Sequence, residues 1–490
     1  ILRRDIERLG FRSGFTIYDS ADSERVVKDI LKEFGLDDKT FPPKSVLGYI
    51  SRAKDAMKLG ADYLRECEKS GDFRLVKIAR IYAEYERRLR DANALDFDDI
   101  ILHTVRLLKQ FDDVRAYYQK KFRYVLIDEY QDTNHLQYQL ASALAGGYEN
   151  ICVVGDDDQS IYRFRGATIE NILSFEHQYK GARVIRLEQN YRSTKNILEA
   201  SNAVIRNNQG RKGKELWTEH GAGDKGMCYT AMNEHDEAQY VAAQILTGFS
   251  GRRAWKDHAV LYRMNAQSAP IESYFTRAGI PHKIVGGQRF NDRKEVKDIL
   301  AYLRVLVNPA DDISVRRIIN VPKRAIGDTT VNELARHAAQ EEMPLLTACM
   351  DMPESLNARA RKSVEKFSEL MMSLTMMQET MKLTELVQYV IDTVGLESQY
   401  TKEDNDENRS RVENIREFVG AVKEFEEKAD NPTLTDYLEN VSLVSDLDEM
   451  GDDGGAVTMM TLHSAKGLEF PNVFMVGMEE NLFPSARSRD

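Results

Sequence analysis

Two acidic side chains follow an apolar run in the stretch FRYVLIDEYQDT, residues 122–133. Such a run, ending here in Asp128 and Glu129, is typical of a buried parallel strand that carries charge to the carboxyl edge of a sheet. Phosphoryl transfer to water needs one carboxylate on Mg²⁺ and a second group that orients the attacking water. Adjacent acids at a strand end can fill both roles. A solvated pair that caps the next helix is the alternative.

A second apolar run ends in acids in VGDDDQSIYRFRGA, residues 153–166. The amide of Gln159 can hydrogen-bond a terminal phosphate without adding charge. The interleaved Tyr162, Phe164 and Arg165 suit a single nucleic-acid strand, because rings stack on bases and guanidinium groups meet phosphates. The alternative is an exposed aromatic turn whose arginine stems lie along the surface.

Two further strand ends carry polar groups, in LEQNYRST (187–194) and in TLHSAKGLEF (461–470). Arg192 is a candidate clamp for charge that develops on a phosphate, and Tyr191 offers a ring to a nucleobase. An ordinary surface arginine and an ordinary strand-to-helix turn are the alternatives. The second stretch names no ligand by itself, although it places His463, Lys466, Gly467 and Glu469 within seven positions.

The elements around these motifs alternate between strand and helix. Residues 1–110 have mostly helical spacing of apolar side chains. The alternation after residue 120 predicts a parallel α/β sheet. Its expected elements are a strand in KFRYVLIDE (121–129), a helix near 137–145, a strand at 150–156, a helix around 168–178 and a strand at 182–190.

A second alternating block predicts another sheet, with a helical block of residues 294–445 inserted into it. Its expected helices are 234–248 and 268–278. Its expected strands are GMCYTAM (226–232), DHAVLYR (257–263), IPHKIVG (280–286), VTMMTLH (457–463) and NVFMVGM (472–478).

Composition limits the class of protein without naming a function. The 490 residues are 30% charged with a net charge of −11, which argues against a general polyanion-coating protein but not against a local basic groove. No apolar run approaches the ~18 residues of a membrane span. The four cysteines form no C-x-x-C pair, which fits a reducing cytoplasm better than a disulfide framework or a zinc site.

Several long motifs in a fixed order resemble those of superfamily 1 DNA helicases of the UvrD/PcrA/Rep type. The resemblance covers nearly the whole chain and is far more specific than any single pattern. The matching stretches are ALDFDDII (94–101), VLIDEYQDT, VGDDDQSIYRFRGA, LEQNYRST, AVLYRMNAQS, IVGGQRFNDRKEVKD (284–298), VPKRAIGDTT (321–330) and TLHSAKGLEFPNVFMVGMEENLFP.

The resemblance implies an α/β fold of two RecA-like parallel-sheet domains, 1A and 2A, both incomplete, with mostly helical insertions 1B and 2B. The implied borders are 1–92 for 1B (with the end of the N-terminal part of 1A at its start), 93–190 for the rest of 1A, 191–290 for the first part of 2A, 291–452 for 2B and 453–490 for the second part of 2A.

The resemblance also implies roles for individual residues. It makes Asp128 the ligand of Mg²⁺ through water and Glu129 the catalytic base. The other implied contacts are Gln159 and Arg192 with the γ-phosphate, Tyr191 with adenine, Glu469 with the ribose, Tyr162, Phe164 and Arg165 with single-stranded DNA, and His463 near the boundary between the two sites. Phe164 stands where relatives often carry Trp, so stacking on a base is expected to be weaker.

The implied activity is ATP-dependent 3′–5′ movement along DNA in repair or replication. ATP and Mg²⁺ are the expected cofactors, and single-stranded DNA and single/double-strand junctions are the expected partners. A cytoplasmic location is expected. In VPKRAIGDTT, Ala325 stands where relatives often have Gly. This turn is either a hairpin whose backbone amides approach duplex phosphates or a plain helix connector.

No G-x-x-x-x-G-K-[ST] phosphate loop occurs in the sequence, and NQGRKGKEL (208–216) has the wrong glycine spacing. We therefore expect an internal fragment that lacks the N-terminal loop and the last arginine motif, and that is inactive alone as an ATPase. Two alternatives remain. One is a non-catalytic single-stranded-DNA-binding protein of helicase shape, and the other is the helicase subunit of a helicase–nuclease.

Overall fold

The computed structural model describes residues 1–163, 166–208, 211, 213–250, 253–285, 290–401, 406–430, 432–443 and 455–484. The chain divides into two compact units. The first unit is Ile1–Val184 with Arg293–Leu443, and the second is Ile185–Asp292 with Val444–Asp490. None of the helices in the described part combines the length and apolarity needed to cross a membrane. The borders expected for 1A, 1B, 2A and 2B stay a prediction.

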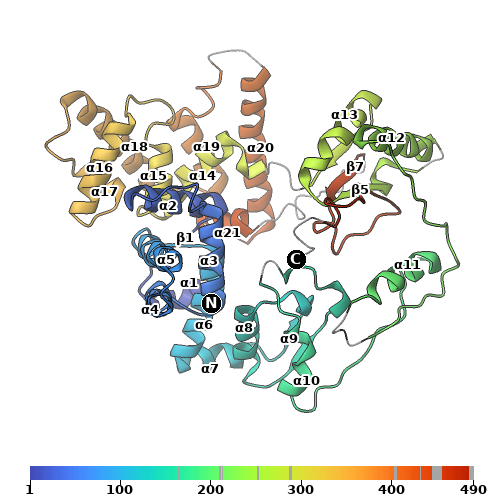
Figure 1. The fold of residues 1–490 in the computed structure, drawn as a ribbon. Helices are drawn as coiled ribbons and strands as arrows, with labels where there is room; N and C mark the ends of the chain where they lie inside the picture. The colour runs from blue at the N-terminus through green and yellow to red at the C-terminus, as the bar shows by residue number, and fades with distance from the viewer. Residues whose placement is uncertain are drawn as a thin grey trace. The chain divides into compact units, whose positions relative to one another are not determined.

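The N-terminal part of the first unit is mostly helical, as expected (Figure 1). Its strands are β1 (Thr16–Ile17), β2 (Ala94–Leu95), β3 (Val125–Ile127) and β4 (Ile151–Val153). Its helices are α1 (Leu2–Asp5), α2 (Ser20–Glu33), α3 (Pro43–Asp55), α4 (Gly60–Ser70), α5 (Phe73–Asp91), α6 (Phe97–Gln110), α7 (Asp112–Lys121), α8 (His135–Ala145), α9 (Glu170–Leu173) and α10 (Phe175–Gln178).

Side-chain caps fix where the longer of these helices begin. Asp19 accepts from the backbone N–H of Asp22 at the start of α2, and Asp96 accepts from that of Asp99 at the start of α6. Such caps satisfy amides that have no partner inside a helix and contribute about 1 kcal/mol each. Behind them, α2, α3 and α5 bury one apolar core that includes Val27, Ile30, Ile50, Ile78, Ile81 and Tyr82.

The motif strands β3 and β4 pair in parallel, with Val125 opposite Ile151 and Ile127 opposite Val153. The prediction that this strand is buried is wrong, because Leu126 is 76% exposed. An apolar run specifies a strand, but burial also requires elements that cover both faces. Among the described residues, the only strand that pairs with β3 is β4. The helix expected around 168–178 is two short helices, α9 and α10.

The described residues of the block Arg293–Leu443 form helices joined by turns and loops, with no strand, as expected. Polar contacts join it to the N-terminal part of the unit: Arg304 donates to Asp22 at 2.8 Å, and the buried Asn308 amide donates to the Thr16 hydroxyl at 2.8 Å. The helices of the block are α14 (Lys294–Val307), α15 (Asp312–Ile318), α16 (Asp328–Gln340), α17 (Leu345–Met350), α18 (Ala358–Gln378), α19 (Leu383–Val394), α20 (Asp406–Lys428) and α21 (Leu434–Leu443).

The stretch VPKRAIGDTT (321–330) contains the turn before α16 and the first three residues of that helix. The Arg324 guanidinium donates to the carbonyl of Ile318 at 3.0 Å and to the hydroxyl of Tyr302 at 2.7 Å, which fixes the turn on α14 and α15. Ala325 has a φ of 59°, in the left-handed region that favours glycine. This conformation gives a physical reason for glycine at the position, whatever the turn binds.

The second unit contains a parallel sheet whose described strands have the order β6-β7-β5-β8. Residues in β5 are buried along its whole length. Figure 1 shows α12 and α13 lying together beside β5 and β7, and Ile245, Phe275 and Val260 share the core between these helices and the sheet. The elements are β5 (His258–Tyr262), β6 (His282–Ile284), β7 (Val457–Thr461), β8 (Asn472–Met475), α11 (Lys195–Ile205), α12 (Glu234–Ser250) and α13 (Ser268–Ala278).

Two expected strands are absent from the described structure. Residues 182–190 form no strand apart from one isolated bridge between Gln189 and Trp217, and residues 226–232 form none. Both stretches carry β-branched or aromatic side chains, but a strand exists only where another strand accepts its backbone hydrogen bonds. The α/β class with parallel sheets and large helical blocks is confirmed.

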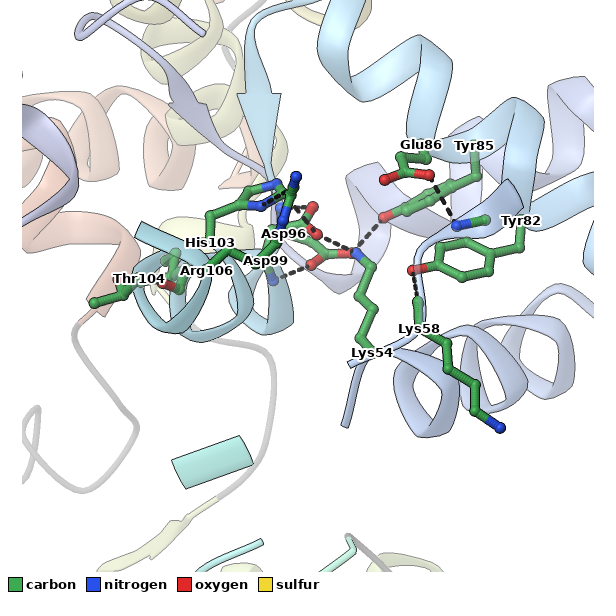
Figure 2. Close-up of polar contacts among 12 residues, drawn as sticks. Lys54, Lys58, Tyr82, Tyr85, Glu86, Asp96, Asp99, His103, Thr104 and Arg106 are labelled. Atoms are coloured by element: carbon green, nitrogen blue, oxygen red, sulfur yellow. Dashed lines mark hydrogen bonds and ion pairs between the residues drawn. The ribbon is translucent and has the colours of Figure 1, made fainter. Parts of the chain in front are cut away.

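A buried ion-pair cluster ties α3, α5 and α6 together (Figure 2). The Lys54 ammonium lies 2.6 Å from Asp96 and 2.7 Å from Asp99, and the Tyr85 hydroxyl donates to Asp96 at 2.9 Å. Burial and the neighbouring Asp96 charge raise the pKa of Asp99 to about 7. Burial opposes the charge on Lys54, but the two carboxylates outweigh it and hold its pKa well above the ordinary value. The cluster therefore positions the start of α6.

We predict that Lys54→Met lowers the free energy of opening of α6 by about 3–5 kcal/mol, because two buried carboxylates lose their cation. Native-state hydrogen exchange of the α6 amides measures this loss. The matched control is Lys28→Met at an exposed site on α2, where a change within about 0.5 kcal/mol is expected. Equal effects of the two substitutions would contradict a stabilising role for the cluster.

Candidate active site

The end of β3 exposes the two predicted acids. Asp128 and Glu129 directly follow the last strand residue, Ile127, and both are exposed. Glu129 has a φ of 50°, and its backbone N–H donates to the Asp128 carboxylate at 2.8 Å. Non-glycine residues in this left-handed region cluster at functional sites. The backbone thus turns sharply directly after β3, at the two acidic residues.

A buried glutamine supports this turn. Gln131 is 0% exposed. Its side-chain amide donates to the Glu129 carboxylate at 2.5 Å, and its side-chain oxygen accepts from the backbone N–H of Asp156 at 2.9 Å. Sequence reasoning gave Gln131 no role. Its place beside the acids in DEYQDT was the only signal.

The loop after β4 carries Gln159. Asp156 accepts from the backbone N–H of Asp158 at 3.0 Å and from the Gln159 side-chain amide at 2.8 Å, so it caps the 3-10 turn Asp157–Gln159. Oxygen atoms of Asp156, Asp157 and Asp158 lie within 4.8 Å of one another. The structure therefore brings Glu129, Gln159 and three further acids to one edge of the β3–β4 pair.

The candidate DNA residues of the first unit follow this loop. Tyr162 is half-buried, while Phe164 and Arg165 lie outside the described residues. Beyond them, the backbone N–H of Thr168 donates to the carbonyl of Thr133 at 3.0 Å, which returns the chain to the segment after the acids. The described residues on both sides of Phe164 and Arg165 are thus hydrogen-bonded to the segment of the two acids.

The candidate nucleotide residues of the second unit lie on a turn closed by Asn190. Its side-chain oxygen accepts from the backbone N–H groups of Arg192 at 3.0 Å and Ser193 at 2.8 Å. The backbone N–H of Asn190 donates to the carbonyl of Trp217 at 2.7 Å. Tyr191 is 75% exposed, so its ring is accessible. Sequence reasoning missed Asn190 and Trp217, although Asn is a frequent first residue of such turns.

The turn after β7 supplies a partner to Arg192. The guanidinium of Arg192 forms an ion pair with the carboxylate of Glu469, and both side chains are exposed. Exposed pairs of this kind contribute at most about 1 kcal/mol, so this contact does little for stability. His463 is half-buried in the same turn. The second unit therefore places Arg192, with its sequence neighbour Tyr191, beside Glu469. The roles of these residues stay predictions.

The chain matches two protein-family models. Residues 1–180 match the UvrD/REP helicase N-terminal domain, and residues 185–490 match the UvrD-like helicase C-terminal domain. The ATP-dependent DNA helicase PcrA of Bacillus subtilis (strain 168) is 46% identical over 496 residues, which cover 100% of this chain and 67% of that relative. PcrA proteins of Staphylococcus epidermidis and Staphylococcus aureus are 45% identical over 491 residues with the same coverage.

The chain belongs to the UvrD-like helicase family. The motif resemblance is thereby confirmed.

We predict that Asn190→Ala loosens the turn that carries Tyr191 and Arg192, because two backbone N–H groups lose their acceptor, at a cost of about 1 kcal/mol. Hydrogen exchange at the amides of Arg192 and Ser193 is expected to quicken about fivefold. Asn190→Asp keeps the acceptor and is the matched control. The assigned turn is wrong if the two variants exchange alike.

Proposed function

We propose that the protein is an ATP-dependent DNA helicase that moves 3′ to 5′ along single-stranded DNA in repair or replication. Family membership and the similarity to relatives named ATP-dependent DNA helicase PcrA support the enzymatic class. The direction of travel comes from the motif resemblance alone. The observation that carries the proposal is the parallel pair β3–β4, which presents Glu129 and the segment of Gln159 at one sheet edge.

In this proposal Glu129 is the base that accepts the proton of the attacking water, and Asp128 binds Mg²⁺ through water. Mg²⁺ takes oxygen ligands, commonly one or two carboxylates together with waters and phosphate oxygens. The exposed Asp128 carboxylate fits that donor set. When bound, Mg²⁺ neutralises charge on the β- and γ-phosphates.

Gln159 and Arg192 are proposed to contact the γ-phosphate, where the Arg192 guanidinium stabilises charge that develops during transfer. The exposed ring of Tyr191 is proposed to stack on adenine, and Glu469 to meet the ribose. Because Glu469 and Arg192 form an ion pair, a phosphate that binds Arg192 competes with that carboxylate. In this proposal Arg192 gives up its ion pair with Glu469 when it binds the phosphate.

The proposed DNA contacts are Tyr162, Phe164 and Arg165, with His463 near the boundary between the nucleotide and DNA sites. Aromatic rings bind single strands by stacking, without strong sequence preference. Single-stranded DNA and single/double-strand junctions are therefore the proposed partners. The four cysteines are free thiols. A cytoplasmic location suits both free thiols and a DNA substrate.

A non-catalytic single-strand binder of helicase shape is the second candidate, and the helicase subunit of a helicase–nuclease is the third. One observation favours the non-catalytic binder: the 490 residues contain no G-x-x-x-x-G-K-[ST]. ATPase activity separates this binder from the enzyme. A nuclease assay on the protein as its gene encodes it separates the helicase–nuclease subunit.

We predict that the 490-residue chain by itself hydrolyses ATP at most slowly, because it carries no loop of backbone amides and lysine to hold the phosphates. DNA-stimulated ATP hydrolysis measures this, with the B. subtilis relative as reference under the same conditions. Turnover within about tenfold of that reference would contradict the prediction, because such a loss of phosphate contacts costs far more.

In the protein as its gene encodes it, Glu129→Gln is expected to lower kcat for ATP about 10²–10⁴-fold, with KM nearly unchanged, because only the base is lost. The control is Glu365→Gln at an exposed site on α18, for which wild-type kcat is expected. Unchanged hydrolysis in Glu129→Gln would remove this residue from the mechanism. Absence of hydrolysis in the wild type would favour the non-catalytic candidate.

A further inference from the structure

A continuous hydrogen-bond chain connects Glu129 with Gln159. The Gln131 amide donates to the Glu129 carboxylate at 2.5 Å, and the Gln131 side-chain oxygen accepts from the backbone N–H of Asp156 at 2.9 Å. The Asp156 carboxylate in turn accepts from the Gln159 amide at 2.8 Å. Two residues that the sequence predicts to act on one phosphate are thus connected through two residues to which it assigns no role.

The surroundings of Gln131 leave its side chain little freedom. It is 0% exposed. A Cβ atom added at Gly155 would lie 2.5 Å from the Gln131 side-chain oxygen and 2.7 Å from Ile172. Glycine at this position therefore leaves room for the Gln131 oxygen to accept from the backbone N–H of Asp156. A buried amide with both of its ends bonded is costly to displace, because each freed group would be left unsatisfied. Gln131 therefore holds the Glu129 carboxylate in one orientation.

The chain of hydrogen bonds extends toward the candidate DNA-binding residues. The hydroxyl of Ser160 donates to the backbone carbonyl of Gln131 at 3.4 Å. Tyr162 comes two residues later in the sequence. The loop 155–162 therefore contacts both the side chain and the backbone of Gln131, and a shift of this loop would displace Gln131.

We propose that Gln131 is a positioning residue for ATP hydrolysis, which orients Glu129 and ties it to the loop that carries Gln159. This inference rests on the proposed function. A base acts only when it is held at the right place relative to the water. A DNA strand that moves the loop at Tyr162 would move Gln131 with it, so the same contact links DNA binding to the rate of hydrolysis.

The sharpest test is Gln131→Glu in the protein as its gene encodes it. The variant keeps the acceptor for the N–H of Asp156 but places a second carboxylate in contact with that of Glu129. Like charges in such contact repel, so the Glu129 carboxylate loses its orientation. We expect kcat, measured with saturating single-stranded DNA, to fall about tenfold or more, with KM for ATP within about twofold.

Two further variants cover the case in which Gln131→Glu does not fold. Gln131→Met removes both hydrogen bonds without charge, and Gly155→Ala displaces the amide by its added Cβ. Each is expected to lower kcat about tenfold or more and to reduce the stimulation of hydrolysis by DNA. The double variant is expected to lose little beyond either single one, because both act on the same contact.

Gln340→Glu, the same substitution at an exposed site at the end of α16, is the control and is expected to keep the wild-type kcat and KM. Wild-type kcat and DNA stimulation in Gln131→Glu, or in Gln131→Met if the first variant does not fold, would overturn the inference. If Glu129→Gln still abolishes hydrolysis in that case, the proposed function stands. Absence of hydrolysis in the wild type would instead overturn the proposed function itself.

Discussion

The parallel pairing of β3 with β4 is the constraint on which the candidate site of the first unit depends. Parallel strands end at the same edge of a sheet, so the residues directly after Ile127 and those directly after Val153 must lie close together. Glu129 lies just beyond the first strand, and the loop of Gln159 lies just beyond the second. A slip of one residue in this register would turn the side chains to the opposite face. Gln131 could then no longer bond both Glu129 and Asp156.

The sequence predicted elements well where an apolar run also had a neighbouring strand. The runs in KFRYVLIDE, NICVVGD, DHAVLYR, VTMMTLH and NVFMVGM contain strands, and each pairs with another. Residues 182–190 have similar composition, yet they form no strand in the described structure and make only one isolated bridge, between Gln189 and Trp217. Leu126 lies in a correct strand but is exposed. Composition determines which segments can extend, whereas burial depends on elements that are distant in sequence.

The site residues divide in the same way. Charged and aromatic side chains at strand ends could be found from the sequence, because the residue type alone shows that a side chain carries a charge or a ring. Gln131, Asn190 and Trp217 could not, because each acts through a backbone contact that exists only in the folded turn. Gly155 acts through the absence of a Cβ atom beside Gln131, which no spacing rule reveals.

Exposure separates the residues that we propose to contact the nucleotide from the residue that we propose to orient Glu129. Asp128, Glu129, Tyr191 and Arg192 are all exposed, which contact with a nucleotide would require. An exposed side chain samples several rotamers, and fixing it at the moment of reaction costs free energy. In the proposed mechanism, a buried amide such as Gln131 removes part of that cost in advance. Because burial is tolerated only when every polar atom is bonded, the contact that orients Glu129 also holds the neighbouring loop in one position.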